Sequence, residues 1–220
     1  MHMQQNKTIG LALACIAGIM PMNALRVFLY RLLFGYEIHK SRIGWNTILC
    51  VASAKLHNCS IGRNNRFVGP MRVVVKEKSV IGQGNTFDCG WWTLEERFAS
   101  AHYAKRIHIG SGVTITNGHH FDIVGAIDIG NATWIAGLGS QFWTHGVGVR
   151  DRDIRIGDNC YIGSAVRMAP GSSVGNNAIV ALGSVVVHKF AEENVLLGGQ
   201  PAKVLREDHD WRATLGATPV

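Results

Sequence analysis

Hydrophobic positions recur every six residues over much of the chain. From Ile156 the hexads read IGDNCY, IGSAVR, MAPGSS, VGNNAI, VALGSV and VVHKFA. The first position of each hexad is apolar, and the fifth is small in all but the last. An α-helix does not have this period, and an extended strand alternates with a period of two. The pattern predicts short strands separated by tight corners, with three hexads to one turn of a triangular coil.

The same register appears earlier in the chain, with interruptions. Aliphatic first positions are expected to stack in a narrow interior, while successive coils pair as parallel strands. The predicted coil domain spans 43–188, and 89–106 lacks the pattern and is expected to leave the coil as an excursion or short helix. The matching apolar positions fall in sets six residues apart: Ile61, Phe67 and Val73; Val75, Ile81 and Phe87; Ile109, Ile115 and Phe121; Ile129, Ile135 and Gln141.

Residues 1–42 are predicted to form an N-terminal helical, apolar segment. Residues 9–20 are apolar but end at Pro21, and they are too few to span a bilayer. The following helix is expected to have Asn23 as its cap and to stop at Gly35. Two interpretations remain: packing against its own domain or a neighbouring subunit, which we favour, or lying on a membrane surface. The apolar face of this helix comprises Leu25, Phe28, Leu29, Leu32 and Leu33.

After the repeat, residues 189–220 are predicted to form a loop and a helix. A turn is expected at 198–201, and an amphipathic helix from Ala202.

Composition and charge narrow the class of protein. The chain has 220 residues, 47% of them hydrophobic and 17% charged, which is typical of a globular domain. The net charge of +7 suggests an anionic partner, but there is no long basic run and no nucleic-acid-binding motif. The five cysteines are widely spaced without a CxxC pair, which indicates reduced thiols and a cytoplasmic location.

The hexads, followed by LLGGQPAKVLRE, resemble the C-terminal part of the hexapeptide-repeat acyltransferases, in their sugar O-acetyltransferase branch. The resemblance covers roughly 43–206. It implies an all-β fold, a left-handed parallel β-helix, which here carries helices at both ends. The left hand comes from the resemblance alone, since the period does not define a hand.

The hexad QFWTHG contains the main candidate for catalysis. His145 falls on its fifth position, and Gln141 replaces the usual aliphatic residue. The glycines and charges that follow predict a polar loop that leaves the coil and places His145 at a rim. The resemblance implies that this histidine is the catalytic base. Imidazole suits that role because it titrates near neutral pH.

A second constellation, TNGHHFDIVG, lies about one coil earlier. His120 or Asp122 is expected to orient His145 or to contact the acceptor, with Asp122 preferred because a carboxylate orients imidazole well. The competing interpretation is a corner whose polar side chains satisfy local backbone groups. His119 and Trp143 are candidate substrate contacts, and the Trp91–Trp92 pair could offer an apolar surface to a sugar ring.

The resemblance also implies acetyl-CoA as donor and a homotrimer with active sites between subunits. Lys203 and Arg206 match positions near the nucleotide end of the cofactor. No metal is expected, because Arg150 stands where a zinc enzyme with this fold would have another histidine. The positions expected along the pantetheine arm are Ser164, Ala181, Leu182 and Gly183.

These observations predict an acetyl-CoA-dependent O-acetyltransferase acting on a sugar or a precursor in surface polysaccharide biosynthesis, in the cytoplasm or at the inner face of the membrane. One alternative is N-acylation of an amino sugar nucleotide, although the chain has no strand followed by GxGxxG. The other is a β-helix that serves as a non-catalytic scaffold.

Overall fold

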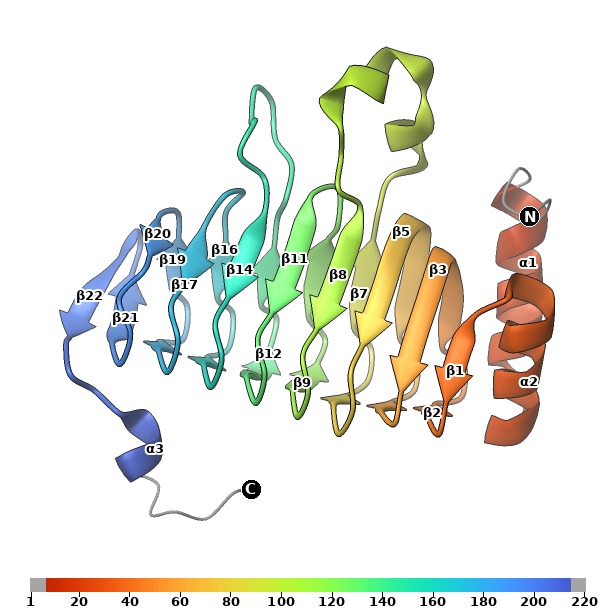
Figure 1. The fold of residues 1–220 in the computed structure, drawn as a ribbon, viewed down its shortest axis with the longest axis horizontal. Coiled ribbons are helices and arrows are strands. Elements are labelled where there is room, and N and C mark those ends of the chain that lie inside the picture. Colours follow the sequence, from red (N-terminus) through yellow and green to blue (C-terminus); the bar gives the residue numbers. More distant parts are fainter. Residues whose placement is uncertain (1–6, 215–220) are drawn as a thin grey trace.

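The computed structural model describes residues 7–214, and the chain in it is wound into a stack of coils (Figure 1). Each regular coil gives one short strand to each of three faces, and strands of successive coils pair in parallel. This confirms the predicted stack of parallel strands, which is consistent with a β-helix. The first face contains β7 (Thr86–Asp88), β10 (His120–Asp122), β13 (Gln141–Phe142), β16 (Arg167–Met168) and β19 (Val185–Val186).

The other two faces follow the same order along the chain. The second face contains β1 (Glu37–His39), β8 (Arg106–Ile109), β11 (Ala126–Ile129), β14 (Ile154–Ile156), β17 (Ser173–Val174) and β20 (Lys189–Phe190). The third contains β2 (Arg42–Ile43), β4 (Ser60–Ile61), β6 (Val80–Ile81), β9 (Thr114–Asn117), β12 (Trp134–Leu138), β15 (Tyr161–Ile162), β18 (Ile179–Val180) and β21 (Leu196–Gly199). Two long strands, β3 (Ile48–His57) and β5 (Arg66–Val75), run from the first face to the second. The paired strands therefore extend beyond 43–188 at both ends.

A stack of phenylalanine rings fills the interior behind the first face. Phe67, Phe87, Phe121 and Phe142 come from four successive coils and are fully buried. Their ring centroids lie 4.2, 4.5 and 4.5 Å apart, with nearly parallel planes. Because each ring covers the next, the register of one coil sets the register of its neighbours.

Small polar side chains occupy the corner between the third and first faces. Thr47 Oγ1 donates to the Gly62 carbonyl at 2.7 Å, and Asn65 Nδ2 donates to the Gly82 carbonyl at 2.7 Å. Asn85 and Ser140 repeat the arrangement in later coils, with Nδ2 donating to Thr116 O and Oγ to Gly163 O. Each side chain thus satisfies a backbone carbonyl in the next coil, which explains why the hexad requires a small residue here.

The predicted register is wrong by one residue at Gln141. The strand pairing is irregular between Ile135 and Leu138, and Phe142, not Gln141, lies opposite Phe121 and Met168. Gln141 is therefore not an inward position that lost its aliphatic side chain. One extra residue in 137–139 displaces the pattern. This segment begins at Gly137, which has a positive φ and where a Cβ would lie 1.7 Å from Ser164 Oγ.

The N-terminal segment forms two helices, α1 (Lys7–Gly18) and α2 (Asn23–Phe34), at one end of the stack (Figure 1). Gly35 ends α2 in the left-handed conformation, but Asn23 does not cap it. Instead, Asn23 Oδ1 accepts the Ile43 N–H at 2.8 Å.

The inward face of α2 is also different from the expected one. Arg26 and Tyr30 are its buried residues, while Phe28 and Leu32 are exposed. Arg26 Nε donates to Ile43 O at 2.8 Å, and Leu49 N donates to the Tyr30 hydroxyl at 3.2 Å. The polar side chains face inward because the first coil presents backbone groups that need partners.

At the C-terminus, the helix predicted from Ala202 is wrong. Residues 202–206 form β22 (Ala202–Arg206), which pairs antiparallel with β21. A short helix, α3 (Trp211–Thr214), follows it, and Trp211 Nε1 donates to Asn159 O at 2.8 Å.

Removing one ring from the phenylalanine stack should weaken the whole coil. We expect Phe121→Ala to lower the free energy of unfolding by about 3–5 kcal/mol, the usual cost of a large cavity in a core. Phe28→Ala is the matched control, and since Phe28 is exposed its effect should stay within about 0.5 kcal/mol. Denaturant titrations of both variants test this. An equal fall in the free energy of unfolding in both would contradict a special role of the ring stack in holding the coils together.

Candidate active site

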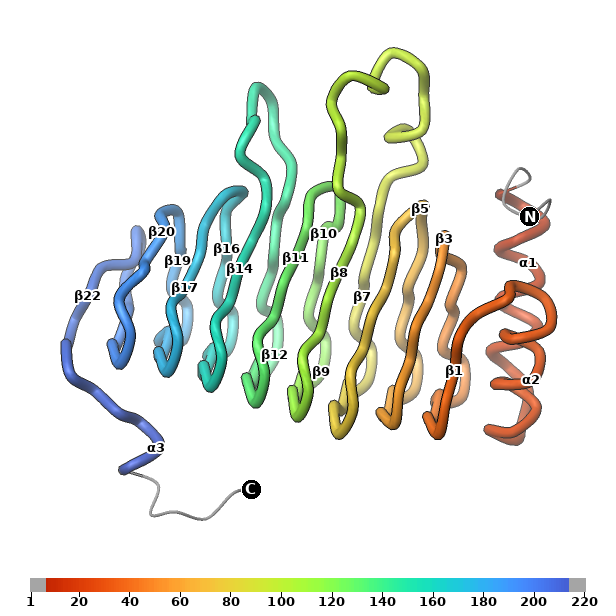
Figure 2. Tube along the Cα trace, viewed as in Figure 1, coloured from red at the N-terminus to blue at the C-terminus, as the bar shows by residue number. Residues whose placement is uncertain are grey.

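Two segments leave the coil at the same corner, between the first and second faces. One joins β7 to β8 and contains the short 3-10 helices η2 (Trp91–Leu94) and η3 (Glu96–Ala101). The other joins β13 to β14 and begins at Trp143. Both project from the same side of the stack in Figures 1 and 2. Only the tight turn between β10 and β11 lies between them along this edge.

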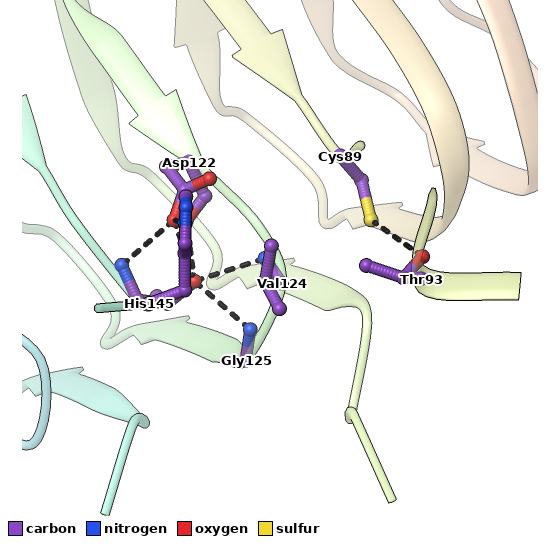
Figure 3. A network of polar contacts seen from close by, with 7 residues as sticks. Cys89, Thr93, Asp122, Val124, Gly125 and His145 are labelled. Atoms are coloured by element: carbon purple, nitrogen blue, oxygen red, sulfur yellow. Dashed lines mark hydrogen bonds and ion pairs between the residues drawn. The ribbon is translucent and has the colours of Figure 1, made fainter. Parts of the chain in front are cut away.

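His145 stands at the base of the second segment and contacts Asp122. Its Nδ1 lies 2.8 Å from Asp122 Oδ2, as Figure 3 shows. The histidine side chain is 42% exposed and the carboxylate side chain 9%. A carboxylate that accepts a hydrogen bond from Nδ1–H favours the tautomer in which Nε2 is free to accept a proton.

Thr144 holds the carboxylate and the turn together. The Thr144 N–H donates to Asp122 Oδ2 at 3.0 Å, and its hydroxyl donates to Asp122 O at 2.7 Å. The same hydroxyl accepts the N–H groups of Val124 and Gly125, each at 2.9 Å (Figure 3). Thr144 is fully buried, so these bonds are shielded from water. This role was not predicted, although Thr144 directly precedes the histidine.

Aromatic residues of the first segment lie beside the histidine. The Trp92 ring centroid is 5.8 Å from that of His145. Trp92 is packed edge-on against Phe98 and Tyr103, at 4.9 and 5.5 Å. The Arg152 guanidinium lies over the Tyr103 ring at 4.9 Å, which joins the two segments above the β10–β11 turn. Together they form a rim around His145.

The other histidines of the second constellation lie elsewhere. His120 packs against Trp143, with centroids 4.8 Å apart, and Trp143 Nε1 donates to Gln141 Oε1 at 3.3 Å. No hydrogen bond between His120 and His145 is present among the described residues. Asp122, and not His120, is therefore the hydrogen-bond partner of the imidazole in the part of the chain that the structure describes.

His119 is buried, at 1% exposure, so its predicted contact with substrate is corrected. It occupies the corner position that Asn65, Asn85 and Ser140 fill in other coils. Its Nδ1 accepts the Ser140 N–H at 3.1 Å, and its Nε2 lies 2.9 Å from Thr116 Oγ1. Both ring nitrogens are thus occupied by contacts within the corner.

The residues expected to bind the cofactor lie at the corner between the third and first faces, across the first face from His145. Ser164 and Ala181–Gly183 belong to the corner before β16 and β19, and Gly183 N donates to Ser164 O at 2.8 Å. β22 brings Lys203 opposite Gly198, and both Lys203 and Arg206 are exposed. The strands of the first face separate this corner from His145.

Cys89, at the start of the first projecting segment, and Cys160, which follows the histidine loop in the chain, are buried thiols. Burial raises the pKa of Cys160 to about 11, and its Sγ donates to Gly175 O at 3.0 Å. Burial likewise raises the pKa of Cys89 to about 12, and its Sγ lies 3.9 Å from Thr93 Oγ1 (Figure 3). Neither thiol is a ready nucleophile at neutral pH, because the thiolate is the reactive form.

Comparisons with known proteins found relatives that are named acetyltransferases. No protein-family model matches the chain. It is 44% identical over 54 residues to a Saccharomyces cerevisiae protein provisionally named an acetyltransferase; the match covers 24% of this chain and 27% of that one. It is 42% identical over 57 residues to galactoside O-acetyltransferase of Escherichia coli, covering 26% of this chain and 28% of the relative. The matched segments thus span about a quarter of these relatives.

A solved structure extends the likeness to most of the chain. The polysialic acid O-acetyltransferase OatWY is 20% identical, with a TM-score of 0.51, over 80% of this chain and 83% of that one. At this identity the likeness concerns the fold. Together with the curated relatives, it confirms the resemblance to the hexapeptide-repeat acetyltransferases, which include sugar O-acetyltransferases.

Burial of His119 makes stability depend on pH in a defined direction. Burial lowers the pKa of His119 to about 4, below its ordinary value of 6.5. The unfolded chain therefore binds a proton in this range that the folded chain does not. The contribution of neutral, buried His119 to the free energy of unfolding is therefore fully present above about pH 6.5 and is lost as the pH falls towards 4.

The variant His119→Asn tests this, since asparagine fills the same corner position at Asn65 and Asn85. The free energy of unfolding should fall more steeply between pH 7 and 4 in the natural protein than in the variant. Denaturant titrations across this range give both profiles. Parallel profiles would show that His119 carries its proton in the folded state.

Proposed function

We propose that this chain is an acetyl-CoA-dependent O-acetyltransferase that transfers acetyl to a hydroxyl of a sugar or surface-polysaccharide precursor. The observation that carries the proposal is the half-exposed imidazole of His145 with Asp122 Oδ2 at its Nδ1. The named activities of the relatives, acetyl transfer to a galactoside and to polysialic acid, support the class of reaction.

In the proposed mechanism, His145 is the general base. Its Nε2 takes the proton of the acceptor hydroxyl while the oxygen attacks the thioester carbonyl. The tetrahedral intermediate collapses, the C–S bond breaks, and the imidazolium returns the proton to the departing sulfur. Asp122 accepts the Nδ1–H bond throughout and stabilises the imidazolium, and Thr144 keeps the carboxylate in place. No enzyme thiol takes part, in keeping with the burial of Cys160.

The acyl donor is proposed to lie along the regular coils that follow the histidine loop. Ser164 and Ala181–Gly183 would contact the pantetheine arm through backbone and small side chains. Lys203 and Arg206 would hold the phosphates of the nucleotide end. The exposed position of β22 beside this corner supports that assignment.

The acceptor is proposed to bind at the rim that the two projecting segments form. Trp92 would provide a flat apolar face beside the imidazole of His145, as aromatic rings do for sugars. His120 and Trp143 lie together on the first face and are proposed as further acceptor contacts.

We further infer from the resemblance that the coil is left-handed and that three subunits associate with their active sites between them. An open face like the first face lacks a second wall, and a neighbouring subunit would provide one. Light scattering tests the assembly, with three chains of 24.0 kDa as the expected mass.

The two alternatives remain N-acylation of an amino sugar nucleotide and a scaffold without activity. A thiol-release assay with acetyl-CoA across simple sugars, nucleotide sugars and amino sugar nucleotides separates the three. We expect release with hydroxyl acceptors. Release only with amino sugar nucleotides would favour N-acylation, and no release with any acceptor would favour the scaffold.

The catalytic pair gives a graded prediction. We expect His145→Ala to lower kcat by about 10²–10⁴-fold, the usual contribution of a general base. Asp122→Asn should lower kcat at least about tenfold with little change in the KM for acetyl-CoA. The amide oxygen can keep the bonds that Asp122 Oδ2 accepts from Thr144 and His145, but a neutral amide no longer stabilises the imidazolium.

Cys160→Ala is the control for a cysteine mechanism and should keep its turnover. The thiol-release assay measures all three variants, and light scattering checks that each retains the assembly of the natural protein. Full turnover in His145→Ala would refute the proposed base.

Trp92 gives a separate prediction about the acceptor. We expect Trp92→Ala to raise the KM for the acceptor about tenfold, a loss of roughly 1.4 kcal/mol of binding, and to leave the KM for acetyl-CoA unchanged. Leu94→Ala, an exposed residue of the same 3-10 helix, is the control. An equal rise in both KM values would show that Trp92 supports the rim as a whole.

A further inference from the structure

The outer surface of α1 and α2 has no role in the coil or in the proposed transfer reaction. We propose that this surface, the N-terminal apolar patch, binds the headgroup region of an anionic lipid bilayer. This inference does not rest on the proposed function. The patch consists of Ile9, Ile16, Ile19, Met22, Phe28 and Leu32, all of them exposed.

Packing against the coil determines which side of each helix faces outward. On α1 the inward residues are small, and a Cβ at Gly18 would lie 2.7 Å from Thr47 O, so this helix lies close against the first coils. Ile16 is on the opposite side and is 50% exposed. On α2 the inward residues are Arg26 and Tyr30, and their opposite side presents Phe28 and Leu32, 56% and 65% exposed. Large apolar side chains therefore lie on the outer sides of both helices.

The charge around the patch matches an anionic surface. Residues 1–36 contain no aspartate or glutamate. Arg31 is exposed on α2, whereas Lys7 on α1 faces the coil, with its Nζ 5.9 Å from the centroid of the Trp91 ring. Glu37, the first acidic residue, pairs with Lys55 at 2.9 Å. Basic side chains beside exposed apolar ones are the pattern by which helices lie on anionic membranes.

Neither a second copy of this chain nor insertion of a helix across the bilayer fits the patch as well. A symmetric contact between two copies would bring two sets of basic side chains together with no carboxylate from either helix to pair with them. Among residues 7–214, no helix is long and apolar enough to cross a bilayer. A surface contact remains, in which the apolar side chains enter the headgroup region and the basic ones lie among the phosphates.

Sedimentation of the full chain with lipid vesicles tests the proposal. We expect binding to vesicles of equal parts phosphatidylcholine and phosphatidylglycerol, and much weaker binding to phosphatidylcholine alone. The variant Phe28→Ser/Leu32→Ser should lower the partition coefficient at least about tenfold, since each buried apolar group contributes to binding. Val80→Ser/Leu138→Ser, which removes two exposed apolar side chains from the third face, should bind as the natural protein does.

A second variant, Arg31→Glu, keeps the apolar side chains and should weaken the preference for anionic vesicles. Circular dichroism and thermal unfolding verify that each variant is folded. The proposal is overturned if the natural protein binds neither vesicle, or if Phe28→Ser/Leu32→Ser binds as well as it does. It is also overturned if that variant lowers the molecular mass in solution while vesicle binding stays unchanged, since the patch would then join copies of this chain.

Discussion

Every feature of this molecule depends on keeping successive coils in register. The backbone of each coil pairs with the coils before and after it, and its inward side chains stack on theirs. The rings of Phe67, Phe87, Phe121 and Phe142 make this constraint visible, with centroids 4.2–4.5 Å apart. A single extra residue can be taken up as an irregularity within a strand, as in β12, but a coil can gain a longer segment only where the chain can leave the stack and return to the same place. Both projecting segments do so at the corner between the first and second faces.

The site follows from this constraint. A residue within the ladders is either buried in the interior or part of a flat outer face, and neither position suits a reactive imidazole. His145 stands where the chain departs, so its ring is half-exposed, while Asp122 remains in the turn of the coil before it. Thr144 links the two, because its hydroxyl and N–H tie the departing loop to the Asp122–Gly125 turn. The rigid stack thus holds the carboxylate, and the loop carries the histidine to it.

The repeat could be predicted from the sequence because the same physical demand recurs in each coil. The apolar first positions from Ile156 to Val186 are all buried, as the hexads indicated. Prediction failed where a single local contact decides the outcome. One residue added near Gly137 shifted Phe142 into the place expected for Gln141. On α2, hydrogen bonds from Arg26 and Tyr30 to the first coils outweighed the apolar pattern, and no periodicity could reveal those partners.

The candidate site could also be predicted from the sequence only in part. The contact of Asp122 with His145 agrees with the preferred orienting residue, since residues one coil apart become neighbours. His119 was assigned to substrate because a histidine suggests chemistry, whereas its position in the coil is that of Asn65 and Asn85. The contact of Trp92 with His145 could not be predicted, because the segment that carries it follows no repeat. Under the proposed function, the regular coils and the irregular segments would bind different substrates. The regular coils after the histidine loop would serve a donor common to many enzymes. The irregular segments before and within it would serve the acceptor, which differs from one enzyme to another.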